Sequence, residues 1–442
     1  MTKQASYTST ALIPQQFDAF LAASADVDLL LGRGETISAH DNNHNQLHVG
    51  LINYCGPGYG TGTPIILQRH LNHLRNKGHQ VTLCAPPSGC RPSTGDNTVD
   101  WLIEIPHRRI WWPPFRSGIK FLYEIRISLI ANYIVKKLQS SCLTHIITTP
   151  YSIYPDVAIK VGRKLCIPLL VLHHDQEEIW SKSEVERKIS IDRTKKLYDN
   201  ADVIMPVTEK LSSVYGYNAE KLKIILPIPG SLEIKNSEGR LSSTSDFVYA
   251  GSIFPYHISF LKNFIAVLFA NNSDFYIIGD RNDLSIKILL ETAPNVHVIP
   301  FFKSNDEAVQ FVANRAATFL VVYEGSQDNQ AWSRTSFPSK FLDFCRARVP
   351  IAIFAPENSA IASWCQDRKW PTFTSNFEEA EIRRIVELVS IPARWNEFAD
   401  QSAMLSNGEF CHRAIQNEFE EALRLASQNY AARVVLSHNA DK

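Results

Sequence analysis

Short apolar runs alternate with segments of helical spacing along most of this 442-residue sequence. The runs have the length of strands, and the segments between them place apolar side chains three or four residues apart, as amphipathic helices do. This alternation predicts parallel sheets that helices cover on both faces. The predicted strands are residues 47–54, 79–84, 144–149, 167–172 and 201–207 in the first half, and 247–251, 275–280, 296–300, 319–323 and 351–354 in the second.

A polar stretch at residues 231–245 interrupts the alternation and is predicted to be a linker. The chain is also too long for one ordinary hydrophobic core, which favours two or three domains. The predicted fold class is α/β, with two doubly wound domains facing a cleft. The predicted parts are an N-terminal extension (1–46), a first domain (47–230), the linker (231–245), a second domain (246–405), and a C-terminal helix and tail (406–442).

The charge balance argues against nucleic acid as a partner. Lys and Arg number 45, as do Asp and Glu, so the net charge is zero and bulk positive charge is lacking. The eight cysteines include no close pair of zinc-ligand type, and several lie in apolar runs, as reduced thiols of a cytosolic protein do. We find neither a secretory signal nor an apolar run of membrane-spanning length. We therefore expect a cytoplasmic location.

A glycine-rich turn follows the first predicted strand. Residues 55–64 hold four glycines within seven positions, including Gly60 and Gly62, and a helix is predicted from Pro64. Glycine lets backbone amides approach a phosphate or a sugar closely. The spacing fits neither the dinucleotide fingerprint nor a nucleotide phosphate loop. A tight strand-to-helix turn without a ligand is the alternative.

The stretch 334–354 is predicted to form a loop, a helix and a buried strand. Proline suits a first helical turn, and Ser339 is expected to cap the free amides of this helix. A helix N-terminus at the carboxyl edge of a parallel sheet is a site for phosphate, to which Lys340 would add a full charge. Asp343, one turn later, could accept hydrogen bonds from ribose or sugar hydroxyls. An ordinary helix–strand unit with a surface lysine and aspartate is the alternative.

Polar residues 173–178 follow another buried strand, where active sites of such sheets are built. Asp175 could orient His174 or stabilise its charge. The spacing fits no standard zinc pattern, so no metal site is predicted. A structural histidine is the alternative.

Residues 107–121 mix tryptophans with basic residues, among them Trp111, Trp112 and Arg116. Rings beside positive charges suit the surface of an anionic bilayer, which predicts peripheral membrane contact. They would also suit an acceptor sugar. A loop that packs its tryptophans on the sheet is the remaining alternative.

Several segments together resemble GT-B glycosyltransferases, and most closely glycosyltransferase family 4. They are GTGTPIILQRHLNHLRNKGHQVTLCAP, VLHHD, the segment from NADVIMPV to KLKIILP, DFVYAG, FYIIGD, VHVIPF and FPSKFLDFCRARVPIAIF, in order across residues 47–366. The resemblance implies two Rossmann-like domains and retaining transfer of a sugar from a nucleotide sugar, with no metal or other cofactor. It also implies that the acceptor binds mainly to the first domain and the donor to the second.

The resemblance further implies roles for single residues. Gly60 and Gly62 would face the donor phosphates, His174 would lie near the reacting sugar, and Asp343 would hold the ribose. The sequence departs from the family where cations for the diphosphate are usual. Ser252 follows Gly251 in place of arginine, Tyr256 and His257 stand near the lysine position, and the earlier glutamate of a paired motif falls at Thr335. Because a developing diphosphate charge needs cationic partners, Lys340 and Arg334 are the candidate replacements, with Lys262 a weaker one.

The predicted function is transfer of a hexose-like sugar to a glycan or lipid-linked acceptor in polysaccharide biosynthesis, at the inner face of the membrane. A GT-B protein that binds a glycan or partner without catalysis is one alternative, and a nucleotide-sugar epimerase is another. The predicted catalytic residues are His174, Asp175 and Lys340. The predicted donor-binding residues are Gly60, Gly62, Gly251, Arg334, Ser339 and Asp343.

Overall fold

The computed structural model describes residues 46–58, 62–87, 99–105, 120–139, 141–234, 245–323 and 330–440. The predicted N-terminal extension, except residue 46, therefore lies outside the described residues. So do Gly60, Trp111, Trp112 and Arg116.

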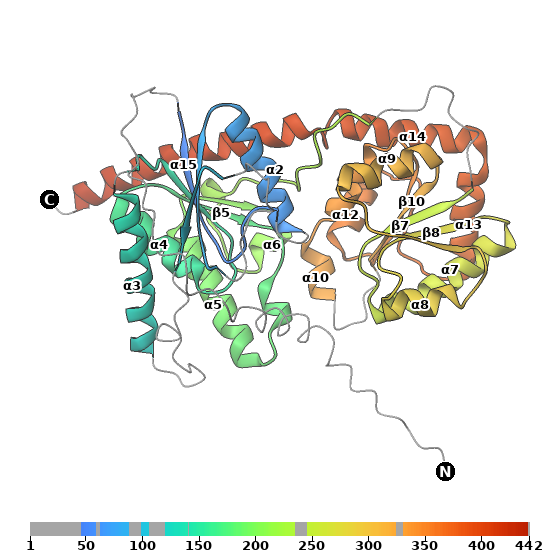
Figure 1. Ribbon diagram of the computed structural model, residues 1–442, viewed down its shortest axis with the longest axis horizontal. Coiled ribbons are helices and arrows are strands. Elements are labelled where there is room, and N and C mark those ends of the chain that lie inside the picture. Colours follow the sequence, from blue (N-terminus) through green and yellow to red (C-terminus); the bar gives the residue numbers. More distant parts are fainter. Residues whose placement is uncertain are drawn as a thin grey trace, which may run out of the picture.

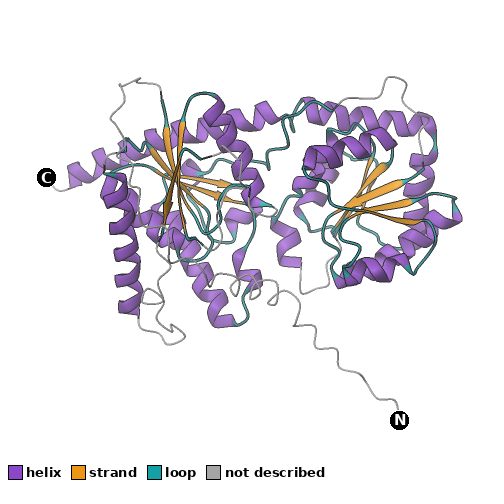
Figure 2. Cartoon of the chain, in the orientation of Figure 1, coloured by secondary structure: helices purple, strands orange, loops and turns teal. Residues whose placement is uncertain are grey.

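Two six-stranded sheets form the cores of two domains, and every strand pair in them is parallel. Figure 2 shows each sheet enclosed by helices, which confirms two Rossmann-like doubly wound domains. The first sheet has the order β3-β2-β1-β4-β5-β6, with β1 (His48–Ile52), β2 (Gln80–Ala85), β3 (Trp101–Glu104), β4 (His145–Thr148), β5 (Leu169–His173) and β6 (Val203–Pro206). The second has the order β12-β11-β10-β7-β8-β9, with β7 (Phe247–Ala250), β8 (Phe275–Ile278), β9 (Val296–Ile299), β10 (Thr318–Val322), β11 (Ile351–Phe354) and β12 (Phe373–Thr374).

Helices connect these strands in chain order. Around the first sheet they are α2 (Thr63–Asn76), α3 (Lys120–Leu138), α4 (Tyr154–Leu165), η2 (Glu177–Trp180), α5 (Glu184–Asn200), α6 (Glu209–Ser213) and η3 (Ala219–Lys221). Around the second they are η4 (Pro255–His257), α7 (Ile258–Ala270), α8 (Leu284–Leu290), α9 (Asn305–Arg315), α10 (Gln330–Thr335), α11 (Ser339–Cys345), α12 (Ala360–Asp367), α13 (Glu379–Ser390) and α14 (Pro392–Asn407). The last helix is α15 (His412–Ala440).

The strands predicted in both halves are confirmed, and most of their residues are buried. Every residue of β1, β4, β5 and β11 is buried, as expected of parallel strands between two helical layers. Strand β3 was not predicted from the sequence. It lies at the sheet edge, where Leu102 and Glu104 are exposed, so it lacks the continuous apolar run that marked the other strands.

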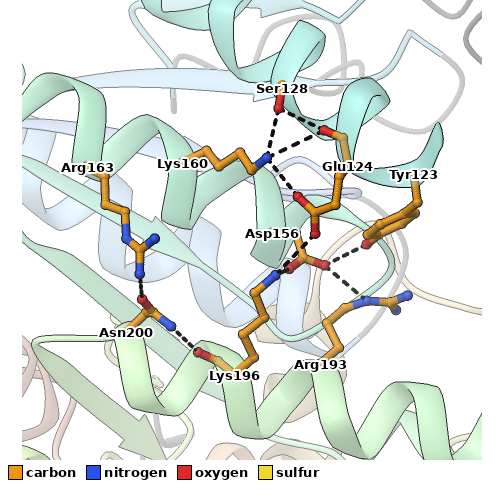
Figure 3. A network of polar contacts seen from close by, with 9 residues as sticks. All are labelled: Tyr123, Glu124, Ser128, Asp156, Lys160, Arg163, Arg193, Lys196 and Asn200. Carbon is orange, nitrogen blue, oxygen red and sulfur yellow. Dashed lines mark hydrogen bonds and ion pairs between the residues drawn. The ribbon is translucent and has the colours of Figure 1, made fainter. Parts of the chain in front are cut away.

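A polar network fastens three helices on one face of the first sheet (Figure 3). The buried carboxylate of Asp156 on α4 accepts hydrogen bonds from the hydroxyl of Tyr123 on α3 (2.6 Å) and from Nζ of Lys196 on α5 (2.7 Å). Arg193, also on α5, lies 3.5 Å from the same carboxylate. Because its partners come from two neighbouring helices, Asp156 fixes α3 and α5 against α4.

Helix α15 leaves the second domain and returns to the first, along which it runs in Figure 1. Hydrogen bonds join Nδ1 of His70 on α2 to Oε1 of Gln416 (2.8 Å) and Nε2 of His145 on β4 to the carbonyl of Leu423 (3.0 Å). Phe419 stacks on His70 and is fully buried. The C-terminal segment therefore completes the cover of the first domain. None of the described helices is long and apolar enough to cross a membrane.

Candidate active site

Each sheet has a point where the strand order reverses, and ligands of doubly wound folds bind at such points. In the first sheet this point lies between β1 and β4, and in the second between β10 and β7. Figure 1 shows α2, α6 and α10 between the two sheets. Some of the predicted site residues follow β1, β5 and β7, and the others lie on α10 and α11 after β10.

The glycine-rich turn lies between β1 and α2, in the part of this region that belongs to the first domain. Gly58 has a φ of +77°, a conformation in which any other residue would be strained, and a Cβ there would also displace the end of the Gln68 side chain. Gly62 has a φ of +70°, is exposed, and is the N-cap residue of α2. Its predicted donor contact remains a prediction, as does that of Gly60.

His174 lies at the end of β5 and is only 5% exposed. Both of its ring nitrogens are buried, and neither has a hydrogen-bond partner among the described residues. Burial lowers the pKa of His174 to about 4, so the ring is neutral near pH 7. A neutral imidazole with two unpaired nitrogens can both donate to and accept from a ligand hydroxyl.

Asp175 does not pair with His174, so the expected orientation of His174 by this carboxylate is wrong. Oδ1 of Asp175 instead accepts hydrogen bonds from the indole N–H of Trp332 (3.3 Å) and the hydroxyl of Ser336 (3.0 Å). Both donors belong to the second domain. Burial raises the pKa of Asp175, while the hydrogen bonds from Ser336 and Trp332 lower it. The neighbouring ring of His173 takes a structural role, with hydrogen bonds to the Tyr198 hydroxyl and the Asp175 carbonyl.

Lys340 and Gly251 meet at the carboxyl end of β7. Gly251 has a φ of +140°, and a Cβ at this position would collide with Nζ of Lys340. The ammonium therefore lies against the backbone of residue 251, beside Ser252, where the family pattern has arginine. Lys340 as a residue is exposed, yet enough protein surrounds its ammonium for burial to lower its pKa to about 8. It is thus mostly charged near pH 7.

An aromatic group follows Gly251 where the family pattern has a second cation. Tyr256 and His257 are in edge contact at 4.5 Å, and Phe254 stacks on Tyr256. Burial, with a smaller contribution from the charge of Lys340, lowers the pKa of His257 to about 4, so His257 is neutral near pH 7. Arg334 and Lys262 are both exposed, on α10 and α7.

Asp343 takes part in an interdomain ion pair. Its Oδ1 and Oδ2 lie 3.0 and 3.1 Å from Nη1 of Arg69 on α2, and the backbone N–H of Gly230 donates to Oδ1 (2.9 Å). Arg346 approaches the same oxygen at 3.7 Å. The contact of Asp343 with ribose remains a prediction. A ribose would compete with Arg69, Gly230 and Arg346 for the oxygens of Asp343.

Ser339 is the first residue of α11 rather than its cap. Pro338 is the N-cap residue, and no side chain caps the helix, so the expected Ser339 cap is wrong. Proline before the helix fixes the entry of the chain without a capping hydroxyl.

Four aromatic or hydroxyl side chains of this region were not predicted from the sequence. Trp332 and Ser336 contact Asp175, and Tyr323 at the end of β10 lies near both Asp175 and Trp332. Tyr151 after β4 is hydrogen-bonded to Thr63 and also lies near Asp175. Their only sequence signal was their place just after predicted strands, which many loop residues share.

Comparisons with known proteins identify the fold and no sequence family. No family model and no curated protein sequence matches the chain. The structure is similar to a glycosyltransferase from Rickettsia africae ESF-5, with a TM-score of 0.60 and 10% identity over 86% of this chain and 99% of that one. HepE of Anabaena, in complex with UDP and glucose, gives a TM-score of 0.59 and 11% identity with the same coverages. Trehalose-6-phosphate from E. coli, bound with UDP-2-fluoro glucose, gives 0.56 and 9%, again over 86% and 99%.

Proposed function

We propose that this chain, whose two Rossmann-like domains form a GT-B fold, is a glycosyltransferase that moves a sugar from a nucleotide sugar to a glycan or lipid-linked acceptor. One observation carries the proposal. The buried, neutral His174 and the carboxylate of Asp175 follow β5 in the first domain. Trp332 and Ser336 of the second domain bind that carboxylate, and in the same domain the ammonium of Lys340 lies against Gly251 at the carboxyl end of β7. The solved structures with UDP and a sugar support a nucleotide-sugar donor.

The charges of the site match the charges of the reaction. As the bond between C1 of the donor sugar and the phosphate oxygen breaks, its electron pair goes to the phosphate, and the sugar carbon becomes positive. The Lys340 ammonium would stabilise the negative phosphate, and the Asp175 carboxylate would stabilise the positive sugar. His174 would hydrogen-bond a sugar hydroxyl and so orient the ring. The new bond forms between C1 and the acceptor oxygen.

We propose a retaining reaction without a metal ion, as the family resemblance implies. The acceptor would enter on the face that the phosphate leaves, and its hydroxyl proton would pass to the leaving phosphate oxygen. The anomeric configuration of the product, read by NMR, tests retention. Unchanged turnover in the presence of EDTA would support metal independence, whereas its loss would overturn that part.

A lipid-linked acceptor and a location at the inner face of a membrane also belong to the proposal. Leu122, Ile125 and Leu129 of α3 are exposed and share one stripe of the helix, and Lys136 and Lys137 follow on its last turn. Such a stripe beside basic residues suits an anionic bilayer. We expect Ile125→Glu with Leu129→Glu to reduce co-sedimentation with anionic vesicles. Equal co-sedimentation of wild type and variant would contradict the membrane contact through α3.

The direct test is a thermal-shift panel of UDP, GDP and ADP with their common sugars. A ligand at 100 times its dissociation constant stabilises the folded state by about 2.7 kcal/mol, which such an assay resolves. We expect one nucleotide sugar to raise the unfolding temperature and Gly251→Ala to abolish the shift, because the new methyl group would displace Lys340. A panel with no shift would contradict the proposal.

A GT-B protein that binds without catalysis is the second candidate, and two observations favour it. Lys340 is the one cation that the described residues bring against Gly251, and both oxygens of Asp343 already have partners. Binding of a nucleotide sugar with neither hydrolysis nor transfer to any glycan would support this candidate over the transferase.

A further inference from the structure

The carboxylate of Asp175 is held from the opposite domain. Trp332 and Ser336 both donate to Oδ1, and no described residue bonds to Oδ2. One oxygen is thus fixed by two neutral donors from the opposite domain. An aspartate held in this way keeps a defined direction, whereas an aspartate without partners rotates about its side-chain bonds.

The segment that carries both donors is docked on the first domain by further hydrogen bonds. The hydroxyl of Thr335 donates to Oε1 of Gln176 (3.0 Å), and its carbonyl accepts from the hydroxyl of Thr208 (2.6 Å). Gln176 in turn donates to buried Glu178 (3.0 Å). Residues 332–336 therefore contact Asp175 and Gln176 in the loop after β5 and Thr208 in the loop after β6.

We propose that Trp332 and Ser336 are positioning residues, which set the carboxylate of Asp175 for catalysis only while α10 is docked on the first domain. This inference rests on the proposed transferase function. In this proposal the first domain supplies the carboxylate of Asp175 and the second domain holds it in place. Movement of the second domain away from the first would break the hydrogen bonds from Trp332 and Ser336 to Asp175.

The charge state of Asp175 gives a readout that a purely structural role would not change. Its pKa is raised by burial and lowered by the two donors, and no described cation contributes to it. The titratable groups near it include Tyr151 and Tyr323, which burial keeps neutral by raising their pKa values. The adjacent rings of His173 and His174 are also near, and burial lowers their pKa values to about 3 and about 4. Loss of either donor should therefore raise the pKa of Asp175, because the ionised form loses a hydrogen bond.

The test compares pH profiles of kcat for wild type, Ser336→Ala and Trp332→Phe, with the donor found in the thermal-shift panel. We expect each variant to lower kcat about tenfold and to move the acidic limb upward by roughly one pH unit, as for one hydrogen bond to a charged group. Ser336→Thr, which keeps the hydroxyl, should restore the profile. KM should change little, because neither residue binds the donor in this proposal.

Ser363→Ala is the matched control, since it removes the interdomain hydrogen bond from Lys210 without touching α10 or Asp175. An acidic limb that stays in place in both donor variants, or that moves equally in Ser363→Ala, would overturn the proposal. Ser336→Ala decides the question alone if Trp332→Phe does not fold.

A readout without activity separates this inference from the proposed function. The tryptophan fluorescence of wild type minus that of Trp332→Phe reports on Trp332, which touches Asp175. The fluorescence difference should change with pH as Asp175 ionises, and this change should be absent in Asp175→Asn. In Ser336→Ala the pH midpoint of the change should move upward. Such a shift in a chain that transfers no sugar would support the positioning and contradict the function. A difference signal unchanged in Asp175→Asn would overturn the positioning.

Discussion

Two aspartates join the domains, and their partners differ in charge. Asp343 faces the cations Arg69 and Arg346 and the N–H of Gly230, which together occupy both of its oxygens. Among the described residues, Asp175 receives two neutral donors, both on Oδ1. An ion pair that occupies both oxygens fixes a structure, whereas a carboxylate whose partners are neutral keeps its charge for a substrate. We therefore expect Asp343 to contribute mainly to stability and Asp175 mainly to the chemistry.

Loss of the ion pair between Arg69 and Asp343, the charged junction of the two domains, should have the largest effect on stability. Asp343→Ala leaves Arg69 without its carboxylate in a largely buried place, and we expect stability to fall by about 3 kcal/mol. The measurement is the midpoint of urea unfolding. Glu397→Ala, which breaks the exposed pair with Arg394, is the control and should change stability by less than about 1 kcal/mol. An unchanged midpoint with loss of nucleotide-sugar binding would show that Asp343 holds ribose instead.

A substitution of Asp175, which receives neutral donors from Trp332 and Ser336, should change activity rather than stability. We expect Asp175→Asn to lower the transfer rate about 100-fold, because the positive charge that develops on the sugar loses its partner. The free energy of unfolding, taken from the urea midpoint, should remain within about 0.5 kcal/mol of wild type. A large loss of stability with an unchanged rate would reverse the roles of the two aspartates.

The cations of the two regions should differ in their response to pH. Arginine side chains in general remain protonated in proteins, whereas burial lowers the pKa of Lys340 to about 8. Donor affinity requires the protonated lysine, so it should be nearly complete at pH 7 and fall about tenfold between pH 7 and pH 9. Calorimetric titration of the donor measures it, and Lys340→Arg should flatten the profile. Equal profiles for both proteins would exclude Lys340 as the phosphate partner.

The smallest effect concerns the stretch between the two junctions, in which Ser339 lies. Ser339 caps no helix, whereas the buried hydroxyl of Ser359 accepts from the N–H of Ala362 at the start of α12 (3.1 Å). We expect Ser359→Ala to cost about 1 kcal/mol in urea unfolding and Ser339→Ala to cost nothing measurable. A cost for Ser339→Ala in donor affinity alone would make it a donor-binding residue.

The two sheets were predictable because each strand repeats one local rule, an apolar run long enough to cross a buried layer. The region of the site was predictable for the same reason, since carboxyl strand ends share one edge of a sheet. The partners of its residues were not. Asp175 and Ser336 are 161 positions apart, and Arg69 and Asp343 are 274 apart, so neither contact leaves a local pattern. The pairing of Asp175 with His174 failed as a prediction because Trp332 and Ser336, from the other domain, bind the carboxylate instead.

The return of α15 to the first domain also affects how the chain folds during synthesis. The last strand of the first sheet ends at Pro206, but the helix that covers α2 and β4 begins only at His412. At ordinary rates of translation, that interval takes roughly 10 to 40 s. During this time the surface that Phe419 and Leu423 will cover is exposed on a sheet that is otherwise complete. A ribosome-bound chain is therefore expected to need a chaperone at this surface, and removal of α15 should make the nascent first domain aggregate.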